Sequence, residues 1–175
     1  RVCTPASSND CPTFNVNGTP VLALGPADAY VYGDTGGQPG LFSIDLASPA
    51  LTPRAVIATV PVASMLFAQG TLFLGMVDGS ISKCTVPCQD ASGISQLRAA
   101  PALVPPPIIT ALAADDRVAG KIFFMQIPAD GVTLSAGGIF AIGTTGSGEE
   151  QLATGADILG SPPPVVPPAA IAVDS

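Results

Sequence analysis

The side chains of this sequence that can transfer protons near neutral pH are carboxylates, because the chain contains no histidine. Without histidine, serine triads and histidine-bearing metal sites are excluded within these residues. We therefore assign no catalytic residue. Three aspartates in or beside turn-rich segments are the candidates for binding a ligand or calcium: Asp34, Asp78 and Asp130.

These three aspartates have two interpretations. Aspartate is common in turns because its carboxylate accepts backbone hydrogen bonds and the residue tolerates the required backbone angles. Loop carboxylates and carbonyls are also the ligands that calcium prefers. No Asp-x-Asp-x-Asp run is present, so we expect turn residues, no cofactor and no metal. Calcium or another ligand at the loops of Asp34, Asp78 and Asp130 is the alternative.

Two further acidic pairs, Asp115-Asp116 and Glu149-Glu150, consist of adjacent residues. In a strand, adjacent side chains point to opposite faces, so neither pair can share a proton as a catalytic dyad does. We expect both pairs in solvated loops.

The four cysteines form two close pairs, Cys3 with Cys11 and Cys84 with Cys88. Each pair closes a short loop, which predicts two disulfides and an oxidising compartment: secreted, periplasmic or cell surface. A four-thiolate zinc site and free thiols are the alternatives. Zinc sites usually show tighter Cys-x-x-Cys spacing, often with histidine, and these spacings are longer.

The charge balance limits the classes of partner. Thirteen acidic residues against six basic ones give a net charge of −7, so no basic stripe exists for nucleic acid. Glycine, proline, aspartate or glutamine interrupts every apolar run before it reaches the length of a membrane-spanning helix. We expect neither a nucleic-acid partner nor a membrane span.

Short strands separated by turn residues must position these side chains. The clearest unit is Thr71–Val77 and Ile81–Val86 joined by Asp78-Gly79-Ser80, since Asp-Gly between strand-length apolar runs is a strong hairpin signal. Similar segments occur before and after it, four to a copy. The first copy is Val21–Gly25, Ala29–Gly33, Leu41–Leu46 and Arg54–Val60; the second adds Met65–Ala68 and Ile94–Ala99 to the hairpin; the third is Ile109–Ala113, Lys121–Gln126, Ile139–Thr144 and Glu149–Thr154.

The copies recur at a period near 42 residues, the separation both of Leu24 from Leu66 and of Tyr30 from Leu72. Four short strands at this period are typical of propeller blades. Alternation puts Tyr30 and Tyr32 on one strand face, where we expect them to pack between blades. The expected organisation is a disulfide-tied leader (1–20), repeats at 21–61, 62–106 and 107–163, and a partial fourth copy at 164–175.

The pattern resembles the NHL and YWTD classes of β-propeller and the propeller repeats of secreted bacterial proteins. The segments that carry the resemblance are Leu22–Leu24 with Tyr30–Tyr32, Leu66–Phe67 with Leu72–Leu74, and Ala111–Ala113 with Ile122–Phe124. The resemblance implies an all-β array of four-stranded antiparallel blades, about three copies plus one strand. A β-sandwich is the alternative fold, although a sandwich does not require a repeat.

These observations favour a secreted, non-enzymatic binding or scaffold module whose specificity lies in its loops, with a protein or glycan partner. Two alternatives remain. The chain is part of a glycan-acting enzyme that uses carboxylates, or it is a subunit of an extracellular assembly joined through exposed strand edges. An incomplete ring would be completed by self-assembly or by further blades of a longer chain.

Overall fold

The computed structural model describes residues 17–34, 39–47, 53–57, 61–88, 90–115, 120–129 and 137–159. The expected Cys3–Cys11 disulfide and the loop of Asp130 lie outside these residues. Within them, no helix has the length and apolar character that a membrane crossing needs.

The described residues form an all-β fold, as the sequence predicts. Three antiparallel sheets each contain four strands in chain order. The first sheet holds β1 (Asn17–Leu24), β2 (Asp28–Asp34), β3 (Pro39–Asp45) and β4 (Pro53–Ile57); the second holds β5 (Val62–Ala68), β6 (Thr71–Met76), β7 (Ile81–Thr85) and β8 (Ile94–Arg98); the third holds β9 (Ile108–Ala114), β10 (Lys121–Ile127), β11 (Gly138–Gly143) and β12 (Glu150–Thr154).

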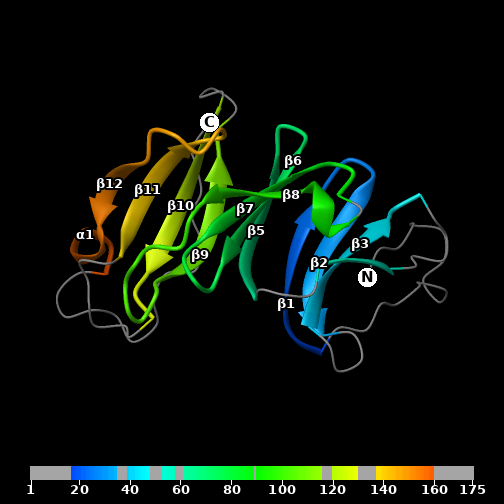
Figure 1. Ribbon diagram of the computed structural model, residues 1–175, viewed down its shortest axis with the longest axis horizontal. Coiled ribbons are helices and arrows are strands. Elements are labelled where there is room, and N and C mark those ends of the chain that lie inside the picture. Colours follow the sequence, from blue (N-terminus) through cyan, green and yellow to red (C-terminus); the bar gives the residue numbers. More distant parts are fainter. Residues whose placement is uncertain are drawn as a thin grey trace.

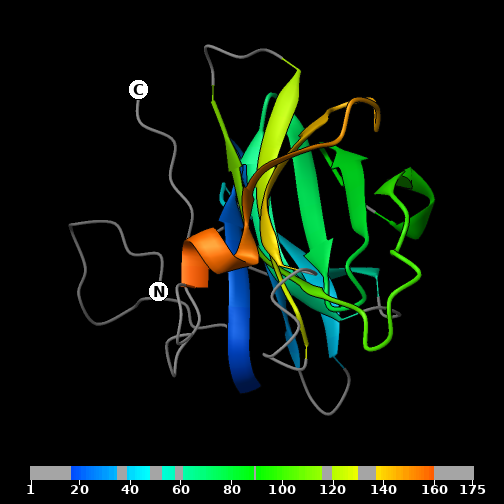
Figure 2. The same cartoon turned by 90° about the vertical axis from the view of Figure 1, so that its left-hand side faces the viewer.

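The sheets follow one another as propeller blades do (Figure 1). Their first strands, β1, β5 and β9, are neighbours, and the second sheet packs against the first on one face and the third on the other. A sandwich would instead bury one face of each of two sheets. The structure is therefore propeller-like. Two short helical segments, η1 (Ala91–Gly93) and α1 (Gly155–Leu159), were not predicted (Figure 2).

Two apolar clusters hold the three sheets together. The first joins Tyr30 and Leu41 of the first sheet to Leu72 and Leu74 of the second. A separate cluster of large apolar side chains joins the second sheet to the third: Phe73, Ile81, Leu97, Ile109, Ile122, Phe124 and Ile142. Tyr30 is fully buried and Tyr32 packs against the same cluster, which confirms the expectation that these tyrosines lie between blades.

The predicted hairpin is the centre of the second sheet. Strands β6 and β7 pair from Thr71 opposite Thr85 to Gly75 opposite Ile81. Gly79 has a φ of +80°, a left-handed conformation that glycine adopts without steric strain. The Asp-Gly pair therefore predicted this turn correctly, because glycine supplies the left-handed conformation that the turn requires.

The first strand begins earlier than the sequence pattern indicates. We expected it at Val21, but β1 starts at Asn17, which lies opposite Asp34 of β2. The ladder shifts register between Asn17 and Val21, as a bulge does. The Asn-Gly-Thr-Pro segment has residues that are typical of a turn. It forms a strand because it pairs with β2, and local sequence does not indicate such pairing.

Candidate binding surface

Asp78 has a structural role in the hairpin turn. Its Oδ1 accepts hydrogen bonds from the backbone N–H of Ser80 at 2.9 Å and from the Ser80 hydroxyl at 2.6 Å. Ser80 is itself buried. The carboxylate thus closes the turn by the local hydrogen bonding that is typical of aspartate in this position.

Asp34 occupies the corresponding place in the first sheet, at the end of β2 and opposite Pro39. The second strands β2 and β6 both end at the lower end of Figure 1. In the part of the chain that the structure describes, no group of three or more acidic, cysteine or histidine side chains is placed to hold a metal ion. The role of Asp34, Asp78 and Asp130 in ligand binding stays a prediction.

Two exposed aspartates cap short helical segments. Asp90 precedes η1 and accepts hydrogen bonds from the hydroxyl and the backbone N–H of Ser92, which lower the pKa of its carboxyl. Asp157 accepts the corresponding bonds from Thr154, with the same effect on its pKa. Hydrogen bonds to the charged form favour ionisation, so both groups are anions at neutral pH and poor proton donors.

The pair Glu149-Glu150 is exposed and ion-paired, but only Glu149 lies in a loop as expected, because Glu150 pairs with Ala141 as the first residue of β12. Glu149 binds Arg98 through both carboxylate oxygens, at 3.0 and 2.9 Å. Glu150 binds Lys121 at 2.6 Å. The sequence could not indicate the first of these pairs, because Arg98 ends β8 of the second sheet and Glu149 directly precedes β12 of the third.

Arg98 connects the predicted turn to the third sheet. Its Nη1 donates a hydrogen bond of 2.6 Å to the carbonyl of Gly79, and its guanidinium carbon lies 5.0 Å from the centre of the Phe124 ring. The structure describes three lysine or arginine side chains, namely Lys83, Arg98 and Lys121. Lys83 donates to the carbonyl of Thr144 at 2.6 Å. Lys83, Arg98 and Lys121 are therefore all engaged within the fold.

The segment that follows Arg98 presents an exposed apolar tip. We call residues 99–107 the Pro loop; it contains Pro101, Pro105, Pro106 and Pro107. Val104 is 98% exposed and Leu103 is 45% exposed. This loop is not among the sites that we predicted from the sequence, although an apolar Leu-Val pair bounded by prolines is a signal that could have identified it.

The Pro loop rests on the Asp78 turn. A Cβ atom added at Gly79 would lie 2.8 Å from the carbonyl oxygen of Pro107 and 2.9 Å from Cδ of Pro101. Pro107 is fully buried and Pro101 is half-buried. The base of the loop is thus fixed against the turn, while its tip projects into solvent.

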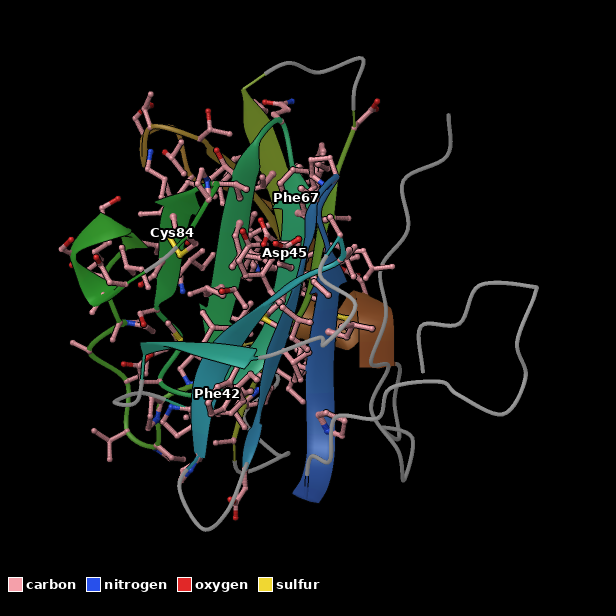
Figure 3. The ribbon with its side chains drawn as sticks, turned by 90° about the vertical axis from the view of Figure 1, so that its right-hand side faces the viewer. Phe42, Asp45, Phe67 and Cys84 are labelled. Carbon is pink, nitrogen blue, oxygen red and sulfur yellow. A yellow bond between two sulfur atoms is a disulfide. The ribbon has the colours of Figure 1, made fainter. Side chains whose placement is uncertain are left out.

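The predicted disulfide between Cys84 and Cys88 is present. Both residues are 1% exposed and belong to the cluster between the first two sheets. The backbone N–H of Cys88 donates to the hydroxyl of Tyr30 across that junction, at 3.4 Å. Figure 3 shows Cys84 beside the green strands of the second sheet. The disulfide therefore belongs to the packing between blades.

No family model matches the chain, and no curated protein matches it. Similar solved structures exist. One is a chain of the structure titled "Crystal structure of Nidogen/Laminin Complex", with a TM-score of 0.56 and 15% identity over 77% of this chain and 48% of that chain. Another is the extracellular domain of BT4673 from B. thetaiotaomicron, with a TM-score of 0.52 and 14% identity over 85% of this chain and 18% of that one.

These likenesses concern the fold. The chain spans about half of the first matched chain and less than a fifth of the second. At such low identities they do not transfer an activity.

Proposed function

We propose that this chain is a non-enzymatic binding module of the cell exterior, and that the tip of the Pro loop recognises a protein partner. The observation that carries this proposal is the exposure of Leu103 and Val104 on a fixed base. Functional residues on rigid scaffolds are concentrated in loops.

The structure of the Pro loop suits recognition. Proline restricts its own backbone φ angle, so a loop with four prolines loses less conformational entropy when it is immobilised on a partner. Apolar side chains that enter a pocket of a partner supply most of the favourable energy of such contacts. A partner with an apolar pocket would therefore gain from Leu103 and Val104 with a small ordering penalty.

The environment of the acidic side chains supports a non-enzymatic role. Asp78, Asp90 and Asp157 stabilise turns or helix ends, and Glu149 and Glu150 are ion-paired. A general acid at neutral pH usually needs a raised pKa, whereas hydrogen bonds from Ser92 and Thr154 lower the pKa values of Asp90 and Asp157.

The Cys84–Cys88 disulfide supports an extracellular location, because disulfides persist in oxidising compartments. The titles of two structural neighbours agree with this proposal: one is an extracellular domain, and the other is a complex of nidogen with laminin. For this chain we propose a protein partner on the same kind of scaffold.

The test compares one double variant and one single variant with the natural chain. Leu103→Asp with Val104→Asp changes the tip alone, and Leu152→Asp changes a similarly exposed apolar residue on β12 as a matched control. The natural chain is crosslinked to the extracellular proteins of its source organism, and the captured protein is purified. We expect the tip variant to weaken binding to that purified protein at least tenfold, as measured by calorimetry, and the control to bind normally.

The proposal is wrong if the tip variant binds its partner as tightly as the natural chain does, or if no extracellular protein is captured. A glycan array, with and without calcium, separates the remaining alternatives. A glycan that binds the tip variant as tightly as it binds the natural chain would favour the glycan-binding alternative. Release of sugar from a bound glycan would favour the glycan-acting alternative. Calcium-dependent binding would point to the loops of Asp34, Asp78 and Asp130.

A further inference from the structure

The Pro loop connects two different sheets. It begins directly after Arg98, the last residue of β8, and it ends directly before Ile108, the first residue of β9 (Figure 1). The direction in which its tip points therefore depends on how the second and third sheets are joined at its base.

The side chains of the Pro loop cannot form hydrogen bonds. Residues 99–107 are alanine, proline, leucine and valine only. Leu103 and Val104 at the tip are exposed, so they make few of the buried contacts that hold a segment in one place. The position of the tip is therefore set by the contacts at the two ends of the loop.

Both ends of the Pro loop meet at Gly79, which is buried. At the start of the loop, Nη1 of Arg98 donates a hydrogen bond of 2.6 Å to the Gly79 carbonyl. At its end, the carbonyl oxygen of Pro107 lies 2.8 Å from the position that a Cβ atom of residue 79 would occupy. One residue of the Asp78 turn thus contacts both ends of the loop.

Glu149 orients the guanidinium of Arg98. Nε and Nη2 of Arg98 donate to the two carboxylate oxygens of Glu149 at 3.0 and 2.9 Å, which leaves Nη1 to bind Gly79. A planar guanidinium that is held by two parallel hydrogen bonds has a fixed orientation. The segment before Glu149 is itself anchored to the second sheet, because Lys83 donates to the Thr144 carbonyl.

We propose that Arg98 and Glu149 are positioning residues for the Pro loop, and that their ion pair raises the affinity of the loop tip for its protein partner. The pair restricts the base of the loop before the partner binds, so less conformational entropy is lost on binding. This inference rests on the proposed function, since it concerns the same tip. It adds that a carboxylate outside the loop, next to β12, controls how tightly the tip binds.

The alternative is that the prolines alone hold the loop. Pro101 also lies against Gly79, with its Cδ 2.9 Å from the same Cβ position, and each proline restricts its own φ angle. The two explanations differ in one respect: only the first makes the tip sensitive to Glu149.

The test replaces Glu149 by glutamine and uses Glu150→Gln as its matched control. Both substitutions remove one negative charge and one ion pair from adjacent residues, but the partner of Glu150 is Lys121 of the third sheet. Nuclear magnetic resonance relaxation measures the backbone order parameters of Leu103 and Val104 in the chain without a partner. We expect values of about 0.85 in the natural chain and in Glu150→Gln, and a fall toward about 0.6 in Glu149→Gln.

Calorimetry then measures binding to the purified protein that the natural chain captures. We expect Glu149→Gln to weaken binding about five- to tenfold and Glu150→Gln to bind normally. Arg98→Lys should behave as Glu149→Gln does, because an ammonium group cannot reproduce the fixed geometry of the guanidinium. Circular dichroism establishes that each variant is folded, and Arg98→Lys tests the proposal if Glu149→Gln does not fold.

Natural affinity in folded Glu149→Gln overturns the inference, whether or not its order parameters fall. Equal effects of Glu149→Gln and Glu150→Gln also overturn it, since a general loss of charge would explain both. Failure of the proposed function gives a different result. In that case Leu103→Asp with Val104→Asp leaves binding unchanged, while the order parameters still show whether Glu149 positions the loop.

Discussion

The guanidinium of Arg98 meets both carboxylate oxygens of Glu149 across the junction of the second and third sheets. The Arg98 side chain is only 11% exposed, and it also binds the Gly79 carbonyl and the face of Phe124. Bidentate pairs of this geometry are stronger than single ion pairs. One side chain therefore couples the Asp78 turn, β8 and the third sheet.

Replacing Arg98 by alanine should lower the free energy of unfolding by about 1–3 kcal/mol, because it removes several charge-assisted contacts from a largely buried site. Urea denaturation measures this loss. Arg98→Lys should recover only part of the stability, since an ammonium group cannot form the bidentate pair. If the lysine variant is as stable as the natural chain, the planar geometry is unimportant.

Loss of the disulfide should destabilise the fold. The Cys84–Cys88 bond closes a short loop, for which the chain-entropy relation gives roughly 2 kcal/mol. Serine at both positions should lower the melting temperature, and a reducing agent should lower that of the natural chain more than that of the double serine variant, which keeps only the expected Cys3–Cys11 pair. Equal sensitivity of the two proteins to the reducing agent would contradict this prediction.

Tyr30 should make stability fall at alkaline pH. Burial is the main cause that raises the pKa of its hydroxyl, and the bond from Cys88 opposes the increase. The unfolded chain therefore loses this proton at a lower pH than the folded chain does, so the free energy of unfolding decreases as pH rises above about 10.

Tyr30→Phe lacks this titration and should lose less stability between neutral and alkaline pH than the natural chain. At neutral pH it should be less stable by about 1 kcal/mol, because the Cys88 N–H loses its acceptor. Parallel pH profiles of the two proteins would show that Tyr30 has an ordinary pKa.

Gly75 should not tolerate a side chain. A Cβ atom there would lie 2.6 Å from Cγ2 of Ile109 on the third sheet, beside the 2.8 Å hydrogen bond from the Ser64 hydroxyl to the Ile109 carbonyl. We expect Gly75→Ala to lower stability by about 1–3 kcal/mol through overpacking. In a double variant with Ile109→Ala, the combined loss should be smaller than the sum of the single losses, because the two changes share one space.

The repeat shows which features of the fold can be predicted from the sequence and which cannot. The 42-residue separation of Tyr30 from Leu72 indicates a blade period, yet these residues are not equivalent. They lie in the same cluster and face each other from neighbouring sheets. The structural equivalent of Tyr30 is Phe73, because an offset of one residue in a strand reverses the face.

The sequence by itself determined the strands, the Asp-Gly turn and the all-β class, since alternation and turn preferences are properties of neighbouring residues. Only the tertiary structure decided which faces meet. Glu149 becomes the partner of Arg98, Cys88 the partner of Tyr30, and the Pro loop an exposed tip on the Asp78 turn, through the packing of separate sheets. Contacts between blades join residues far apart in the chain, so no local pattern encodes them.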